Sequence, residues 1–336
     1  MTGILAIEYT LPDKILTNEE LATLYKNWSA EKIFNKTGIR SRHVISEDET
    51  AADLGVVAAE KVIAKNIVPK EEIDFVLCVT QSPDYQLPTT ACIMQERLGL
   101  SQKTGAFDIS LGCSGYIYGL AVAKSLVETG IANNVLLITA ETYSKHINPL
   151  DKSTRTIFGD GAAATLIGHG GMEIGSFDLG TDGSGKDFLI IPTGGARKAC
   201  TPETAIEKEV DGNVRSEDNL FMSGADIFEF TIREVPASVK RIMKKEGLKK
   251  DNIGLYVFHQ ANQFMLDFLV KLMKVDKEKF YMNFADTGNT VSASIPIAFK
   301  RAMDEGMVKP NQTILLCGFG VGLSWGSTVI RTGSYV

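Results

Sequence analysis

The strongest constraint on the fold is an alternation of short apolar runs with helical stretches, which occurs in both halves of the chain. In the first half, strand-like runs and helical stretches alternate, with strands at 4–9, 75–79, 105–109 and 135–139 and helices at 50–66, 90–98 and 115–130. In the second half, the predicted order is helix 225–247, strand 254–258, helix 262–273, helix 292–306 and strand 312–317. Strands that alternate with helices predict an α/β fold in which helices cover the sheet.

The repetition of this order predicts a duplicated architecture. A chain of 336 residues exceeds the usual size of one domain, so two closely packed halves are expected. We place the boundary near Gly170, in a glycine-rich passage, so that the halves comprise residues 1–170 and 171–336. Residues 197–216 are polar and lack a periodic pattern, which predicts a flap rather than a linker between independent domains.

The charge and cysteine content exclude several classes of function. The net charge is -6 without long like-charge runs, so neither nucleic acid nor an anionic membrane is expected as a partner. No apolar run approaches the roughly 20 residues that cross a bilayer, no leader opens the sequence, and a cytoplasmic protein is expected. The five cysteines are scattered and form no CxxC pair, which predicts no disulfide framework, no zinc site and a reducing compartment.

A glycine-flanked cysteine lies between a predicted strand and a predicted helix, in the segment 106–116. At a helix start, oriented N–H groups favour an anion, and a thiol pKa can fall from about 8.5 to between about 3.5 and 7.5. Cys113 is therefore a candidate nucleophile, and Gly112 and Gly115 permit a tight turn and close approach of a thioester. The alternative is an inert buried cysteine, an interpretation that fits Cys78, Cys92 and Cys317.

Two further candidates follow predicted strands in the second half. His259 ends the apolar run 254–258, and Asn262 can cap the helix that follows. Asn289 lies in a Gly-Asn-Thr turn before an alanine-rich helix, where its amide can point into a cleft at the same sheet edge. Taken alone, His259 could be a structural histidine and Asn289 an ordinary turn residue. The remaining histidines lack this placement and are interpreted as structural: His43, His146 and His169.

Together, these segments resemble the Cys-His-Asn site of the β-ketoacyl-acyl carrier protein synthase III family in order and approximate spacing. The resemblance extends over nearly the whole chain, through the segments 37–40, 158–162 and 318–326. It implies the thiolase fold, in which duplicated βαβαβαββ halves form a five-layered αβαβα core, and it implies a homodimer.

The resemblance also implies a function. An acyl group would pass to Cys113, with its oxyanion held by the backbone N–H groups of Cys113 and Val321. His259 and Asn289 would then assist decarboxylative Claisen condensation with a malonyl thioester, in fatty-acid or specialised polyketide-type biosynthesis. Acyl-coenzyme A or acyl-carrier-protein thioesters would be the substrates, and no permanently bound cofactor or metal is implied.

Substrate contacts are implied by the same resemblance, at Leu87, Phe319, Lys36, Lys152, Gly224 and Asn262. Leu87 would lie on a loop that reaches the partner's acyl pocket and helps to set chain length. Lys32, Lys36 and Lys152 stand where the family has a tryptophan and arginines around the coenzyme A adenine, and lysine has no planar face with which to stack.

Two residues depart from the family's basic docking surface for the acidic carrier protein. Phe264 stands in place of an arginine and Glu229 in place of a lysine, with Lys271 and Lys274 as partial replacements. Carrier-protein delivery is therefore possible but would use altered contacts.

Three alternatives are compatible with the fold. A related acyltransferase would pass the acyl group from Cys113 to an alcohol or amine without decarboxylation. A degradative thiolase needs a second cysteine in a Cys-x-Gly context, whereas Cys317 directly precedes Gly318. A non-catalytic partner subunit would not need all three candidate residues.

Overall fold

The computed structural model describes residues 1–334, and the strands of both halves form one ten-stranded sheet within that range. The strand order across the sheet is β14-β13-β15-β16-β8-β1-β7-β6-β4-β5. The strands are β1 (Thr2–Thr10), β4 (Phe75–Val79), β5 (Gly105–Ile109), β6 (Val135–Glu141), β7 (Gly161–His169), β8 (Met172–Thr181), β13 (Ile253–Phe258), β14 (Phe280–Tyr281), β15 (Thr313–Gly320) and β16 (Ser324–Arg331).

This sheet consists of two units with the same topology. In the first unit β1-β7-β6-β4-β5 are neighbours, and in the second β8-β16-β15-β13-β14 follow the same order. In each unit the first two ladders are antiparallel and the last two are parallel. The two units are joined where β1 pairs with β8, and this pairing involves only two residue pairs. The turn between β7 and β8 contains Gly170, where the sequence placed the boundary.

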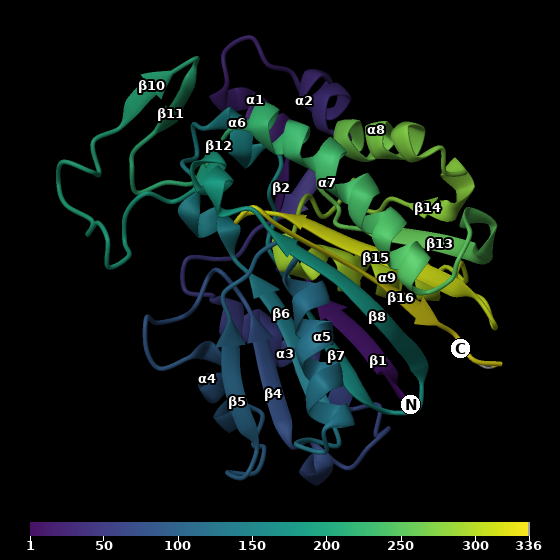
Figure 1. The fold of residues 1–336 in the computed structure, drawn as a ribbon. Coiled ribbons are helices and arrows are strands. Elements are labelled where there is room, and N and C mark those ends of the chain that lie inside the picture. Colours follow the sequence, from purple (N-terminus) through teal and green to yellow (C-terminus); the bar gives the residue numbers. More distant parts are fainter. Residues whose placement is uncertain (335–336) are drawn as a thin grey trace.

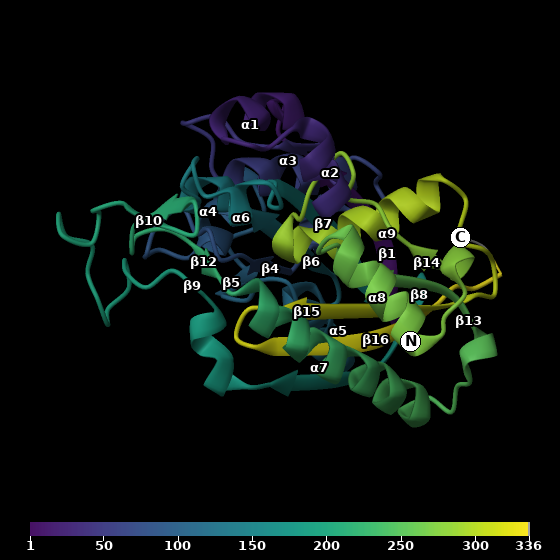
Figure 2. The same cartoon turned by 90° about the horizontal axis from the view of Figure 1, so that it is seen from above.

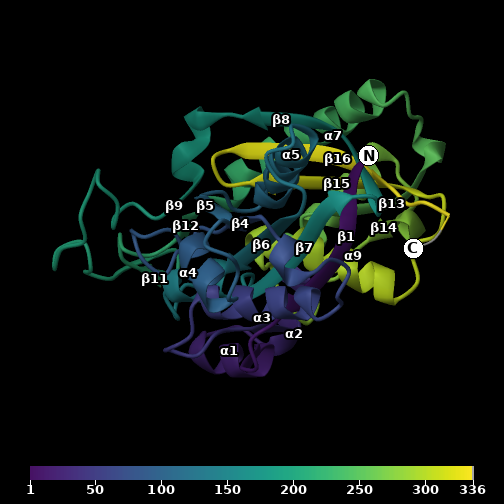
Figure 3. The same cartoon turned by 90° about the horizontal axis from the view of Figure 1, so that it is seen from below.

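The helices form three layers around the two sheet units. Within residues 1–334 they are α1 (Asn18–Leu24), α2 (Ala30–Thr37), α3 (Ala51–Ile63), α4 (Thr90–Arg97), α5 (Gly115–Glu128), α6 (Lys152–Arg155), α7 (Gly224–Lys245), α8 (Gln263–Met273) and α9 (Ser294–Asp304). Helices α5 and α9 contact strands of both units, whereas α3 packs on strands of the first unit and α7 on strands of the second. Figures 2 and 3 show α3 and α7 on opposite outer sides, so the predicted αβαβα arrangement is confirmed.

Smaller elements surround the sheet. Three two-stranded ribbons pair β2 (Ile15–Thr17) with β3 (Ser41–His43), β9 (Leu189–Ile190) with β12 (Phe221–Met222), and β10 (Lys208–Val210) with β11 (Asn213–Arg215). The 3-10 helices are η1 (Lys70–Glu72), η2 (Tyr143–His146), η3 (Gly183–Phe188), η4 (Lys250–Asn252), η5 (Lys277–Lys279) and η6 (Val291–Ala293). Figure 1 shows the β10–β11 hairpin projecting from the body, in the segment predicted to be a flap.

The local sequence explains most element boundaries. Strands β4 and β5 have the predicted bounds because each is a short apolar run between polar segments. The side chain of Asn262 accepts a hydrogen bond from the Met265 N–H and caps α8, as predicted. Strands β7, β8 and β16 were not predicted, since β7 begins Gly-Ala-Ala-Ala and β8 lies in a glycine-rich passage, compositions with weak strand propensity.

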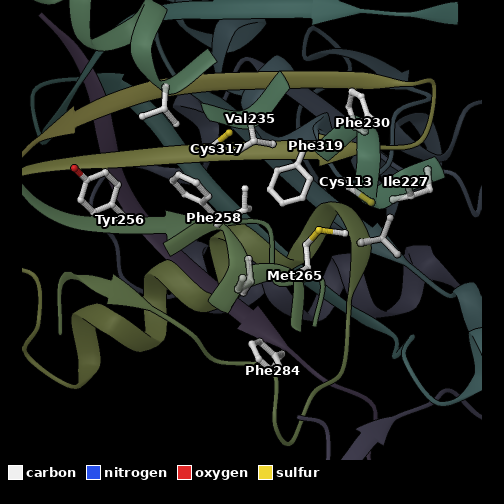
Figure 4. Packing of buried hydrophobic residues seen from close by; sticks show 14 of the residues in the cluster. Cys113, Ile227, Phe230, Val235, Tyr256, Phe258, Met265, Phe284, Cys317 and Phe319 are labelled. Atoms are coloured by element: carbon white, nitrogen blue, oxygen red, sulfur yellow. The ribbon is translucent and has the colours of Figure 1, made fainter. Parts of the chain in front are cut away.

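The largest buried cluster lies between α7, α8 and the second sheet unit, and it reaches the candidate nucleophile. Figure 4 shows Cys113, Phe319, Ile227 and Met265 together in this packing. The candidate site therefore lies within the apolar core rather than on the surface. In residues 1–334, every helix is too short or too polar to span a membrane.

Candidate active site

Cys113 lies in the turn between β5 and α5, with only 4% of its surface exposed. The second half approaches it closely through β15, because a Cβ added at Gly320 would collide with the Cys113 side chain. The Val321 N–H donates a hydrogen bond to the Cys113 sulfur. Glycine at position 320 thus lets a backbone N–H from the second half reach the thiol of the first.

The protonation state of Cys113 differs from the sequence prediction. Burial raises the pKa of the Cys113 thiol to about 12, and the nearby Glu141 carboxyl adds to the increase. Hydrogen bonds from the Val321 and Cys113 backbone oppose this increase but are too weak to reverse it. The predicted lowering of the pKa at the helix start is therefore wrong for the free protein, in which the sulfur carries its proton at neutral pH.

His259 directly follows β13 and is 2% exposed. Burial lowers the pKa of its imidazole to about 3, although a hydrogen bond with the Val291 backbone favours the charged form. Its Nδ1 lies 2.7 Å from Ser294 Oγ, and its Nε2 lies 3.4 Å from Asn289 Nδ2. The ring also meets Phe319 edge to face, with 5.5 Å between centroids. The imidazole is therefore neutral and held from several sides.

The Asn289 side chain has a defined orientation. Its Oδ1 accepts a hydrogen bond of 2.9 Å from the Val291 N–H, which leaves Nδ2 directed toward His259. Because the amide nitrogen can only donate, His259 Nε2 accepts in this arrangement and the ring proton is assigned to Nδ1.

The backbone of Asn289 is tied to the segment 157–159, which belongs to a motif noted in the sequence. The Asn289 N–H donates to the Ile157 carbonyl at 2.9 Å, and the Gly159 N–H donates to the Asn289 carbonyl at 3.0 Å. A Cβ at Gly159 would collide with the Thr287 carbonyl, so glycine is needed for this close approach. The motif thus anchors the Asn289 turn to the first half.

One cavity of about 140 Å³ brings the three candidate side chains together. Cys113, His259 and Asn289 all line it, and so do three of the predicted substrate contacts: Phe319, Gly224 and Asn262. Its remaining lining is apolar and comes from Ile157, Phe158, Leu189, Met222, Ile227, Ala261 and Met265, with Gly320 beside the thiol. A thiol and two hydrogen-bonding side chains therefore meet in a cavity whose lining is largely apolar.

The other predicted contacts lie outside this cavity. Leu87 is 83% exposed on a surface loop. Lys36 lines a separate surface groove of about 420 Å³ between α2 and α8, together with Phe264. Lys152 borders a third groove, and its ammonium bonds the Gly212 carbonyl of the hairpin turn. In this chain, none of these three residues lines the cavity that contains Cys113.

Two polar residues near the candidate side chains were missed from the sequence. Ser294 contacts the His259 ring, and Glu141 is a fully buried carboxyl near Cys113 at the end of β6. Ser294 belongs to no local pattern that would single it out. A signal for Glu141 does exist, since a lone acid at the end of an apolar strand run is unusual in a buried position.

Comparison with known proteins adds a second line of evidence. Residues 107–183 match the family model for 3-oxoacyl-[acyl-carrier-protein (ACP)] synthase III, and residues 243–332 match the model for its C-terminal part. A β-ketoacyl-[acyl-carrier-protein] synthase III of Caldanaerobacter subterraneus is 38% identical over 332 residues, which are 98% of this chain and 97% of that protein. The protein of the same name from Clostridioides difficile is 39% identical, with 98% of both chains covered.

Solved structures agree with these sequence matches. A crystal structure of a 3-oxoacyl-(acyl-carrier-protein) synthase III is 47% identical with a TM-score of 0.96, covering 98% of this chain and 99% of that one. The priming β-ketosynthase of the R1128 polyketide pathway is 28% identical with a TM-score of 0.87, covering 100% of this chain and 97% of that one.

Proposed function

The chain belongs to the 3-oxoacyl-[acyl-carrier-protein] synthase III family, and we propose that it transfers an acyl group to Cys113 and condenses it with a malonyl thioester. The product is a 3-oxoacyl thioester, in fatty-acid or polyketide-type biosynthesis. The observation that carries the proposal is the shared cavity of Cys113, His259 and Asn289.

In the first step, the Cys113 sulfur attacks the carbonyl carbon of an acyl thioester. The carbon–sulfur bond to the carrier breaks, and the proton of Cys113 is transferred to the departing sulfur, which leaves as a thiol. The N–H groups of Cys113 and Val321 both contact the sulfur region and can stabilise the transient oxyanion. A thiol with a raised pKa requires that deprotonation accompany the attack rather than precede it.

In the second step, the malonyl thioester loses carbon dioxide, and the resulting enolate carbon attacks the acyl carbon on Cys113. The acyl–sulfur bond breaks, Cys113 leaves as a thiolate, and a proton taken up from solvent regenerates the thiol. Negative charge develops on the malonyl thioester oxygen, so donors directed there stabilise the transition state preferentially. Asn289 Nδ2 supplies one such donor.

His259 can supply the second donor through a change of tautomer. Ser294 Oγ lies 2.7 Å from Nδ1 and is a hydroxyl, which can either accept from Nδ1–H or donate to a bare Nδ1. When Ser294 donates, the ring proton is on Nε2 and faces the cavity. The neutral ring that burial favours is therefore suited to donate a hydrogen bond to an enolate oxygen without carrying a charge.

The test combines two measurements on one sample. Intact mass after exposure to a panel of acyl thioesters reports the acyl group on Cys113, and carbon dioxide release from malonyl thioester reports decarboxylation. The proposal expects both, with a 3-oxoacyl product. Ester or amide product without carbon dioxide would instead assign acyl transfer to an alcohol or amine, and no acyl-enzyme with any donor would overturn the proposal.

A homodimer is part of the proposal. Strand β5 ends the sheet in residues 1–334, its Phe107 is 38% exposed, and the nearby loop exposes Tyr85 and Leu87 by 64% and 83%. Exposed apolar side chains at a sheet edge support association with a second copy. In that dimer Leu87 would reach the partner's acyl pocket, so Leu87→Gly and Leu87→Phe should shift the chain-length profile in opposite directions. Unchanged profiles would reject this role.

We also propose that the carrier contact is apolar rather than ionic. Helix α8 exposes Phe264, Phe268 and Leu272 by 63%, 37% and 45%, and Phe228 of α7 packs its ring 5.3 Å and 5.0 Å from the two phenylalanines. This surface begins beside Asn262, which lines the cavity. The rate with a carrier-bound donor should then depend weakly on salt and fall in Phe264→Ala, while the rate with a free pantetheine thioester should not change.

We assign the reaction to the cytoplasm, an assignment supported by the free state of Cys78, Cys92, Cys113, Cys200 and Cys317.

A further inference from the structure

The inference concerns Glu141, a carboxyl that the proposed chemistry does not use. Glu141 is 0% exposed, and one oxygen accepts from the Gln81 N–H at 3.0 Å and faces Ser82 Oγ at 3.5 Å. The other oxygen lies 2.6 Å from Ser292 Oγ. The carboxyl thus joins the end of β4 in the first half to the turn before α9 in the second.

The surroundings of Glu141 favour its neutral form. The ionisable groups that face it are the carboxyl of Asp160, the thiols of Cys78 and Cys113, and the phenol of Tyr143. Burial raises the pKa of Glu141 to about 8, against its hydrogen bonds with Ser292, Gln81 and Ser82. At neutral pH the carboxyl therefore carries a proton and can both donate and accept.

Toward the second half, Glu141 holds a strained turn. Ser292 follows Val291, a fully buried β-branched residue with a φ of 53°, a conformation that such residues rarely adopt. Backbone strain of this kind persists only where the surroundings fix it, and it is concentrated at functional sites. The Val291 N–H in this conformation bonds Asn289 Oδ1 and thereby sets the direction of the Asn289 donor.

Toward the first half, Glu141 holds the backbone beside the nucleophile. The Gln81 side-chain oxygen lies against Gly112, where a Cβ would collide with it. That oxygen also accepts a hydrogen bond of 2.5 Å from the hydroxyl of Tyr143, which is 4% exposed. The same carboxyl therefore bonds Gln81, whose side chain lies against Gly112 beside Cys113, and Ser292, which follows the turn that orients Asn289.

We propose that Glu141 is a positioning residue that, through Ser292, holds the Asn289 donor in place for decarboxylation and links it to the nucleophile segment through Gln81. The inference rests on the proposed function, because it assigns Asn289 to the malonyl step. It predicts that loss of the Ser292 contact impairs decarboxylation more than acylation, since only the donor is released.

The test compares two hydroxyl deletions that both remove a contact of Glu141. Ser292→Ala removes the contact to the Asn289 turn. The control Ser82→Ala removes the contact that leads away from this turn, together with the acceptor of the Thr142 N–H, which lies 3.2 Å from Ser82 Oγ. Ser292→Ala should lower carbon dioxide release roughly 10- to 100-fold, the loss expected for a donor misplaced by about 1 Å, and change the acylation rate less than about threefold. Ser82→Ala should change both rates less than about threefold.

Substitutions of Glu141 itself complete the test. Glu141→Gln reproduces the neutral acid, with an amide N–H for Ser292 and an oxygen for the Gln81 N–H, and should retain decarboxylation within about threefold. Glu141→Ala should lower the rate of decarboxylation as much as Ser292→Ala does. The inference would be overturned if Ser292→Ala slowed acylation and decarboxylation equally. It would also be overturned if Glu141→Gln slowed decarboxylation as much as Glu141→Ala. A wild-type protein that forms an acyl-enzyme without releasing carbon dioxide would instead contradict the proposed function.

Discussion

Replacing Asn289 separates two roles of one side chain. In the structure, Nδ2 faces His259 and the cavity, while Oδ1 accepts the hydrogen bond of the Val291 N–H at 2.9 Å. Asn289→Ala removes both the cavity donor and the backbone acceptor. Asn289→Asp keeps an oxygen for the Val291 N–H and removes only the amide donor, so it serves as the matched control.

The two losses have different magnitudes. Removing one donor to a developing oxyanion commonly costs about 10²- to 10³-fold in rate, or roughly 3 to 4 kcal/mol of transition-state stabilisation. Leaving the buried Val291 N–H without an acceptor costs about 1 to 3 kcal/mol of folding free energy. Asn289→Ala should therefore lose activity and leave the Val291 N–H without an acceptor, whereas Asn289→Asp should lose activity while that N–H keeps its acceptor.

The assay measures carbon dioxide release from malonyl thioester, the mass of the acyl-enzyme and the melting temperature for each variant. Both variants should still form the acyl-enzyme, because the thiol and its backbone donors are untouched. A protonated aspartic acid could still donate, so the rate is measured over a pH series that passes the raised pKa expected for a buried carboxyl. Wild-type decarboxylation by Asn289→Asp after ionisation would refute the donor role. Equal melting temperatures of Asn289→Ala and wild type would refute the backbone role.

Three further predictions follow from the same geometry. Because the pKa of the Cys113 thiol is raised to about 12, its labelling by iodoacetamide should rise about tenfold per pH unit from pH 7 to 10, and a plateau near neutral pH would contradict this. Gly320→Ala should abolish acylation, because its Cβ would collide with the Cys113 side chain, and an acyl-enzyme formed at the wild-type rate would contradict the packing. The raised pKa of Glu141, about 8 against 4.5, means that the unfolded chain loses this proton while the folded protein keeps it, so stability falls as pH rises through that window. Relative to wild type, the folding free energy of Glu141→Gln should therefore improve as pH rises from 4.5 to 8, by at most about 5 kcal/mol, and its melting temperature should rise accordingly. A difference independent of pH would contradict the assignment.

Much of the fold could be predicted because strands of the parallel ladders are short apolar runs. Strands β4 and β5 are such runs, and their ends placed the Cys113 turn correctly between β5 and α5. Strand β7 was not predicted, because its alanines are buried by pairing with β1 and β6, which are distant in sequence. Local composition cannot reveal pairing of that kind.

The energetics of the site were harder to predict than its members. The helix-start rule anticipated a lowered pKa for Cys113, but the rule assumes a solvated turn, and here the second half closes over the sulfur. The strained turn at Val291 is likewise absent from the sequence pattern, which predicted a helix from 292 whereas α9 begins at Ser294. Both features depend on contacts between the two halves.

The duplication explains why one cavity collects these residues. In each sheet unit the last strand in the order leads into a turn and then into a central helix, β5 to α5 in the first and β14 to α9 in the second. Cys113 and Asn289 occupy these two equivalent turns, and both central helices contact both units. A fold that packs two copies of one unit about a shared helical layer must bring the equivalent turns close together. The proposed nucleophile and the proposed donor can therefore differ in chemistry while the architecture keeps them within reach of one cavity.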